Sequence, residues 1–271
     1  MKSKRRKAVQ MYHDRVAHRY DDIYDDSYWQ WHDALTWGYL KPHLPVRQGE
    51  AIIDLGCGTG KWGIKLAQSG YTVTCLDISH KMLEVVWRKV PALGLDAKVT
   101  CLHADLMDLS EVPAAEFALA VAFGEALCTV ESPAKALKQI YRILKPGGLL
   151  VATIDNRLAN LDYFLEKGDL AGMERFIKTG RTHWLTKTPE EQFELHTQTP
   201  RQLTKLITGA GFEVVEMIGK TVLPVRRYRH LLEDRTDFRT LLALERKLAR
   251  NPDAVGRAAH LQVTARKPIE S

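Results

Sequence analysis

The sequence contains no apolar run of the length that a membrane-spanning helix requires. Its basic start, residues 1–15, lacks the apolar segment of a secretory signal. The four cysteines form no C-x-x-C pair and lie in or beside stretches expected to be core strands, as reduced thiols commonly do. No internal repeat or low-complexity segment is present. These absences predict a cytoplasmic protein with no membrane partner.

The charge of the chain does not predict a nucleic-acid partner. The formal net charge is +6, and basic side chains gather in residues 2–7 and 226–229. Such clusters can contact nucleic acid or anionic substrates. No aromatic-interleaved basic repeat or recognition helix accompanies them. We therefore interpret them as a solvated tail and an exposed loop. The 271 residues, 45% of them hydrophobic, suffice for one large domain or for one domain with a cap.

Residues 51–63, AIIDLGCGTGKWG, are the most informative stretch. An apolar run predicts a strand buried on both faces, followed by a glycine-rich turn and a helix. The pattern of a phosphate-binding loop does not fit, because Leu55 stands at its first glycine position and Trp62 at its hydroxyl position. The dinucleotide pattern on Gly58, Gly60 and Gly63 begins two residues too late. An acid-x-Gly-x-Gly-x-Gly pattern fits at Asp54, Gly56, Gly58 and Gly60.

Strand and helix patterns alternate five times between residues 51 and 154, which predicts a doubly wound parallel sheet. The expected strands cover residues 51–55, 71–76, 98–102, 117–123 and 149–154. Asp77 and Asp105 follow the second and third strands. Because a ligand binds at the carboxyl ends of such strands, we expect these acids to lie at its edge. Ser79 and Thr199 are placed to cap the helices after them.

These motifs together resemble those of the class I S-adenosylmethionine (SAM) methyltransferases. The L-K-P-G-G segment at residues 144–148 strengthens the resemblance, which spans roughly residues 10–266. It implies a Rossmann-like sheet of seven mostly parallel strands, with the last one antiparallel, and SAM as the cofactor. Asp77 would hold the ribose hydroxyls, and Asp105 the adenine amino group. The cofactor-binding residues so implied are Tyr20, Asp54, Gly56, Cys57, Gly58, Gly60, Asp77, Ile78, Ala104, Asp105, Leu106 and Phe123.

The segments around this core are expected to enclose a pocket. Residues 1–45 carry a dense aromatic set and predict a helical lid. Residues 46–154 form the SAM-binding core, and residues 155–199, with no clear strand, an inserted substrate cap. Residues 200–271 complete the core with strands at 212–218 and 260–265, and with an excursion at about 219–256 that is helical around 241–248.

The resemblance implies transfer of the sulfonium methyl to a small-molecule nucleophile by in-line displacement. A base is needed only if the nucleophile arrives protonated, and the candidates are His196, His183 and Asp155. No His or Cys ligand spacing is present, so we expect no metal. A tRNA or protein acceptor, a non-catalytic SAM or nucleotide binder and an NAD-dependent oxidoreductase remain open. The acceptor and the oligomeric state, with a homodimer as one option, are not determined.

Overall fold

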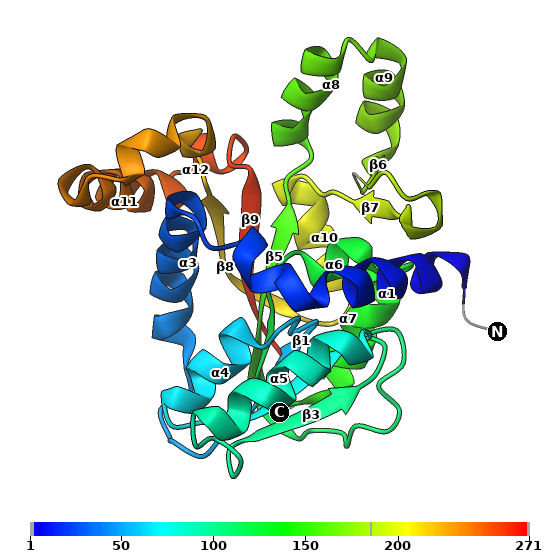
Figure 1. Cartoon of the computed structure of the whole chain (residues 1–271), viewed down its shortest axis with the longest axis vertical. Coiled ribbons are helices and arrows are strands. Elements are labelled where there is room, and N and C mark those ends of the chain that lie inside the picture. The colour runs from blue at the N-terminus through cyan, green and yellow to red at the C-terminus, as the bar shows by residue number, and fades with distance from the viewer. Residues whose placement is uncertain (1–2, 185, 270–271) are drawn as a thin grey trace.

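The computed structural model describes residues 3–184 and 186–269, and its centre is one seven-stranded sheet (Figure 1). The strand order is β3-β2-β1-β4-β5-β9-β8. Strands β1 to β5 pair in parallel, and β9 is antiparallel to both of its neighbours. This confirms the predicted doubly wound sheet. The strands are β1 (Ala51–Leu55), β2 (Thr72–Asp77), β3 (Val99–His103), β4 (Phe117–Ala122), β5 (Leu144–Asp155), β8 (Glu213–Lys220) and β9 (His260–Arg266).

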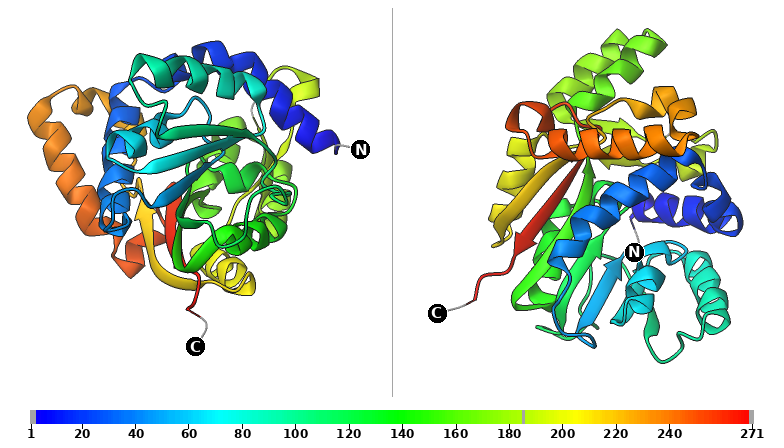
Figure 2. Two further views of the ribbon diagram at one scale, coloured as in Figure 1. Left: turned by 90° about the horizontal axis from the view of Figure 1, so that it is seen from below. Right: turned by 90° about the vertical axis from the view of Figure 1, so that its left-hand side faces the viewer.

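Helices cover both faces of the sheet, as the two views of Figure 2 show. On one face lie α3 (Ser27–Leu40), α4 (Lys61–Gln68) and α5 (His80–Ala92), and on the other α7 (Pro133–Ile143) and α10 (Pro200–Gly209). Successive side chains of a strand point to opposite faces. Ile52 accordingly packs in the cluster that contains Leu66 of α4, whereas Ile53 packs in the cluster that contains Leu137 of α7. Both strand residues are fully buried.

The predicted helix caps are present. The Ser79 hydroxyl accepts a hydrogen bond from Met82 N at the start of α5. Thr199 and Gln202 form a reciprocal capping box at the start of α10. One boundary was wrong, because β5 begins at Leu144 rather than at residue 149 and so includes the L-K-P-G-G segment. Its pairing with β4 is irregular there, and Gly147 has φ 78°, so the segment bends within the strand.

The prediction of no strand in residues 155–199 was also wrong. Here β6 (Arg181–His183) and β7 (Glu194–His196) form an antiparallel pair. Strands of three residues are too short to show an alternating pattern. Before them, α8 (Leu161–Lys167) and α9 (Leu170–Thr179) project beyond the sheet (Figure 1). The excursion is more helical than expected, with η5 (Val225–Leu232), α11 (Arg235–Ala249) and α12 (Pro252–Val255).

The N-terminal residues form α1 (Lys4–Val16), α2 (Tyr20–Ile23) and α3. Helix α3 is firmly part of the body, because Trp31 and Leu35 are fully buried in a cluster with Ile218 of β8. Helix α1 crosses the sheet at the end where α6 lies (Figure 1). The remaining short elements are η1 (Ala17–Arg19), η2 (Lys41–His43), α6 (Ala126–Thr129), η3 (Leu158–Asn160) and η4 (Pro189–Glu191).

A substitution of Gly63 tests the packing of α4 on the sheet. A Cβ added at Gly63 would lie 2.4 Å from Cys75 Sγ of β2. We expect Gly63→Ala to lower the free energy of unfolding by about 1–3 kcal/mol, measured by urea denaturation, because the core there is already filled. The matched control is Gly209→Ala at the end of α10, where no atom lies within 4 Å of the added Cβ and stability should hold or rise. Equal effects of the two variants would contradict this packing.

Candidate active site

The turn after β1 adopts a backbone that favours glycine. Gly56, Gly58 and Gly60 have φ values of 71°, 54° and 85°. A Cβ at Gly56 would lie 2.8 Å from Ala126 Cβ, and one at Gly60 would lie 3.0 Å from Val86 Cγ2. Gly56 N and Cys57 N both donate to Leu76 O, which ties the turn to the end of β2. The three glycines thus form a tight cradle at the opening of α4.

Two buried carboxylates hold this turn. Asp54 is 1% exposed, and its Oδ2 accepts a hydrogen bond from Gly63 N at 2.8 Å. Burial raises the pKa of Asp54 to about 7, although the bond from Gly63 lowers it. Asp77 accepts from Gly58 N through Oδ2 and from Ser79 N through Oδ1, both at 2.8 Å. Burial raises the pKa of Asp77 as well. Asp54 therefore faces the helix, whereas Asp77 lies directly beside the glycine turn.

Asp105 lies on the next loop along the same edge. Ala104 N donates to Asp77 O, which joins the loops after β2 and β3. Asp105 Oδ1 accepts from Met107 N at 2.9 Å, and Arg6 Nε lies 3.1 Å from Oδ2. A pocket of about 160 Å³ lies here, lined by Arg6, Leu102, Ala104, Asp105 and Leu109 among others. The two acids predicted at strand ends are thus brought to adjoining loops.

The other residues predicted for this site surround the two loops. Tyr20 lies over the turn, with its Cε1 3.6 Å from a Cβ added at Gly58. Phe123 is buried, and its ring centroid lies 5.2 Å from that of Trp62. Leu106 is buried in the core, Cys57 is buried in the turn, and Ile78 O is bonded to His103 Nε2. The structure therefore brings the predicted residues together around these two loops. Asp54 and Leu106 are buried in the body of the protein beneath the others.

A second group of polar side chains lies beside the turn, at the ends of β4, β5, β8 and β9. We call it the acceptor cluster, and its members are His32, Thr36, Glu125, Thr153, Asp155, Lys220, His260 and Gln262. Asp155 and Lys220 each pair with His260 in the sheet register, so these three side chains form a row on one face. Helix α3 covers that face, and the ring centroids of His32 and His260 are 5.4 Å apart.

Several atoms of the acceptor cluster are buried without a hydrogen-bond partner among the residues described. They are Glu125 Oε1, Gln262 Oε1 and both ring nitrogens of His32. Lys220 is 1% exposed, and its one hydrogen bond in the described part of the chain goes to Thr36 Oγ1 at 3.0 Å. Each unmet buried polar group costs about 1–3 kcal/mol. So many in one place indicate a site arranged for a ligand.

Burial and mutual charge set the protonation of this cluster. Burial lowers the pKa of His260 to about 4 and that of Lys220 to about 8. Burial, together with the charge of Glu125, raises the pKa of Asp155 to about 8. Burial alone would raise the pKa of Glu125, but His260, Lys220 and His32 outweigh it and the net pKa is lowered. At neutral pH Glu125 is thus ionised, Asp155 is protonated and His260 is neutral.

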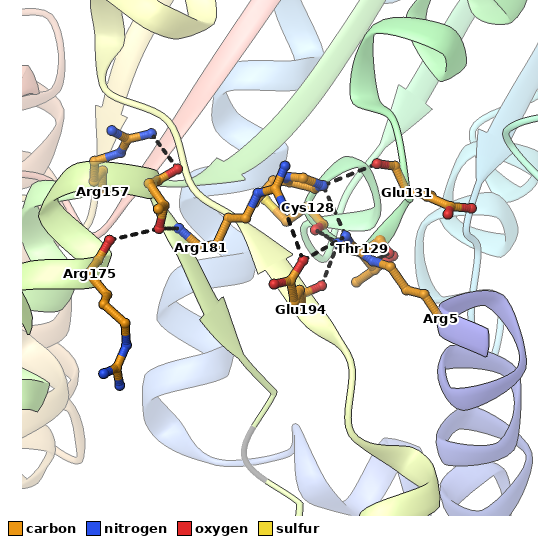
Figure 3. A network of polar contacts seen from close by, with 10 residues as sticks. Arg5, Cys128, Thr129, Glu131, Arg157, Arg175, Arg181 and Glu194 are labelled. Carbon is orange, nitrogen blue, oxygen red and sulfur yellow. Dashed lines mark hydrogen bonds and ion pairs between the residues drawn. The ribbon is translucent and has the colours of Figure 1, made fainter. Parts of the chain in front are cut away.

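The three predicted catalytic residues are separated. Asp155 belongs to the acceptor cluster. His183 is exposed on β6, and His196 lies on β7, where Arg5 Nη1 is 3.0 Å from its Nε2. Figure 3 shows Arg5 reaching from α1 to the carbonyls of Cys128 and Thr129 beside this strand. A ring nitrogen facing a guanidinium is an acceptor whose lone pair is already used, so this contact does not favour His196 as a base.

Seven of the eight residues of the cluster, all except Asp155, were not predicted. A signal was present in β9, where HLQVTA alternates polar and apolar residues. Such a pattern usually indicates a strand with one face in water. Here Gln262 and Thr264 on the polar face are each 2% exposed, because α3 covers them. Only the packing of α3, which is distant in sequence, turns that polar face into a site.

The fold and site define a protein that binds a nucleoside-containing cofactor across the carboxyl ends of parallel strands, beside a buried polar cluster. Residues 53–152 match the family model described as "Methyltransferase domain". Residues 53–152 thus resemble a methyltransferase domain, and the protein is an enzyme, a SAM-dependent methyltransferase. The glycine cradle and the buried Asp77 beside it fit this cofactor, which supplies a methyl group on a positively charged sulfur.

The curated relatives are all named as methyltransferases, but their names give different substrates. The tRNA 5-carboxymethoxyuridine methyltransferase of Escherichia coli (strain K12) is 24% identical over 259 residues, 94% of this chain and 95% of that protein. The demethylmenaquinone methyltransferase of Clavibacter sepedonicus is 42% identical over 103 residues, 38% of this chain and 40% of that protein. A solved SAM-dependent methyltransferase from Methanosarcina mazei matches the fold, with a TM-score of 0.61, 24% identity, and coverage of 86% of this chain and 98% of that one.

None of the helices in residues 3–184 and 186–269 is long and apolar enough to cross a membrane. Within the same ranges, no three His, Cys, Asp or Glu side chains gather in a way that would hold a metal ion.

The buried imidazole of His260 predicts a pH dependence of stability. Its pKa falls from 6.5 to about 4 on folding, so the folded state binds fewer protons than the unfolded state in that interval. Stability is lost as pH falls from 6.5 towards 4. Between pH 6.5 and 4, we expect the free energy of unfolding of the unsubstituted protein to fall by up to about 3 kcal/mol more than that of His260→Gln. Urea denaturation at a series of pH values measures this difference. His80→Gln, at an exposed position of α5, is the control and should behave as the unsubstituted chain does. Parallel curves for all three proteins would contradict the burial of His260.

Proposed function

We propose that this enzyme transfers the SAM methyl group to a small-molecule nucleophile bound against the acceptor cluster. The observation that carries the proposal is the position of the cluster. Gly56 of the cofactor turn lies against Ala126, the residue after Glu125. Cofactor and acceptor sites therefore adjoin at the switch point between β1 and β4, where ligands of doubly wound sheets bind.

The residues around the turn have distinct proposed roles. The glycine turn would hold the amino-acid part of SAM, Asp77 the ribose hydroxyls and Asp105 the adenine amino group. The protein then has to align the nucleophile with the methyl group and keep water away. Residues 1–45 would serve as the lid and residues 155–199 as the substrate cap. In support of this, α1 contacts the cofactor loops through Arg6 and the cap through Arg15, whose Nε lies 2.6 Å from Glu191 Oε1.

Calorimetric titration with SAM, S-adenosylhomocysteine (SAH) and NAD tests the cofactor, and a screen of small acceptors with mass detection tests the reaction. We expect SAM and SAH to bind and NAD not to bind. Methylation of a small molecule in the screen would support the proposal. Preferential binding of NAD, or SAM binding with no methylated product from any acceptor class, would contradict it.

A second candidate is a tRNA acceptor. The relative named for tRNA matches 94% of this chain, and the net charge of +6 suits a polyanion. The enclosed cluster favours a small molecule, because its reactive groups lie under α3 rather than on a basic surface. Binding of unmodified tRNA that weakens steeply with salt and supports methyl transfer would favour the tRNA acceptor instead.

Substitution of Asp77 tests the proposed ribose contact. We expect Asp77→Ala to weaken SAH binding, measured by calorimetry, by about 1–3 kcal/mol, because ribose hydroxyls would lose their acceptor. The control is Asp96→Ala, an exposed acid in the loop before β3. Unchanged affinity in Asp77→Ala, with the fold intact by circular dichroism, would place the ribose elsewhere.

A further inference from the structure

Glu125 has a strained backbone at the junction of the two sites. It has φ 57° and ψ 30°, in the left-handed region, directly after Gly124 with φ 64°. A non-glycine residue there costs about 1 kcal/mol or more. Of the three described non-glycine residues with positive φ, two border the acceptor cluster, Glu125 and Thr221, which follows Lys220. Strain concentrated at one cluster indicates that the side-chain placement there is functional.

The Glu125 carboxylate is central to the cluster electrostatically. Its charge acts on His32, Lys220 and His260 on one side and on Tyr20, Tyr24 and Tyr28 on another. No Lys220–Glu125 ion pair within 4.0 Å occurs in the described chain, and Glu125 Oε1 has no hydrogen-bond partner there. Burial and the charge of Glu125 raise the pKa of Asp155 to about 8, whereas the pKa of Glu125 is lowered, so Glu125 carries a negative charge more readily than Asp155 does.

We propose that Glu125 accepts a hydrogen bond from the atom that is methylated, so that the acceptor is a neutral amine or alcohol rather than a carboxylate or a thiolate. This rests on the proposed small-molecule function. An anionic nucleophile would face a buried carboxylate of like charge, whereas an N–H or O–H group meets Glu125 Oε1, which has no hydrogen-bond partner among the described residues.

The reaction of a neutral amine fits this arrangement. The nitrogen lone pair forms the new N–C bond while the C–S bond breaks, and the electrons of that bond stay on sulfur. The positive charge moves from sulfur to nitrogen, beside the Glu125 carboxylate, which stabilises it. The surplus proton on nitrogen then passes to the Glu125 carboxylate, which already accepts its hydrogen bond, and from there to water. For an alcohol, the O–H proton passes to Glu125 as the O–C bond forms and the C–S bond breaks, so that no oxonium ion has to form.

Four probes that share one ring separate the acceptor classes: aniline, phenol, thiophenol and benzoate. At neutral pH the first two are neutral donors, and the last two are largely anions. We would titrate each into the full chain saturated with SAH and follow binding by saturation-transfer NMR and calorimetry. We expect aniline and phenol to bind about tenfold or more tighter than the two anions, as a hydrogen bond to an ionised group would give.

Variants assign that preference to Glu125. We expect Glu125→Gln to reduce aniline and phenol binding about tenfold while SAH affinity is unchanged. Glu125→Gly, which suits the left-handed backbone, should give the same loss and remains informative if the Gln variant does not fold. Glu131→Gln, at an exposed acid in the same stretch, is the matched control and should bind the probes normally.

The outcomes separate this inference from the proposed function. Benzoate or thiophenol binding as tightly as aniline, no probe binding at all, or probe binding unaffected by both Glu125 variants would overturn the inference. If SAH binds and another small acceptor is methylated, the proposed function survives that result. If SAH itself does not bind, the proposed function fails as well.

Discussion

The buried hydrogen bonds that two carboxylates accept from the backbone around the glycine turn hold the rest of the site in place. Asp54 fixes the first turn of α4 through Gly63 N, and Asp77 fixes the turn itself through Gly58 N. Asp77 is the last residue of β2 and Asp54 the last but one of β1, and these parallel strands lie side by side in the sheet. Their burial is costly, and the amide donors offset it. This geometry keeps the backbone close to where the cofactor binds, and it brings the turn against Ala126 and hence next to Glu125.

Most of the fold was predictable because its signals are local. Buried strands appear as apolar runs, helix starts appear as Ser79 and Thr199, and the alternation of strand and helix gives a parallel sheet. Asp77 and Asp105 were predictable because the carboxyl ends of parallel strands share one edge. The β6–β7 pair was missed because its strands are short and its pairing depends on the cap as a whole.

The acceptor cluster was beyond sequence reasoning for a different reason. His32, Glu125, Lys220 and His260 come from four separate parts of the chain, and none stands in a motif. His196 and His183 were chosen as candidates because they lie in the cap, but proximity in sequence does not bring them to the cluster. What brings the cluster together is α3, whose apolar side packs against β8 and η5 through Trp31 and Leu35. That packing carries His32 and Thr36 over the polar face of β9 and β8.

Helix α1 contacts both the cofactor loops and the cap. Successive helical residues point in different directions, so Arg5 reaches Cys128 O and the cap while Arg6 reaches Asp105. Farther along, Asp14 accepts from the Ser79 hydroxyl after β2, and Asp21 accepts from the Thr59 hydroxyl in the glycine turn. Residues 3–25 therefore contact each of the three cofactor loops through a charged side chain. If Asp105 binds adenine as proposed, the cofactor would compete with Arg6 for this acid. Displacement of Arg6 would then disturb the helix that contacts the cap through Arg5, so entry of the cofactor would be linked to the shape of the acceptor site.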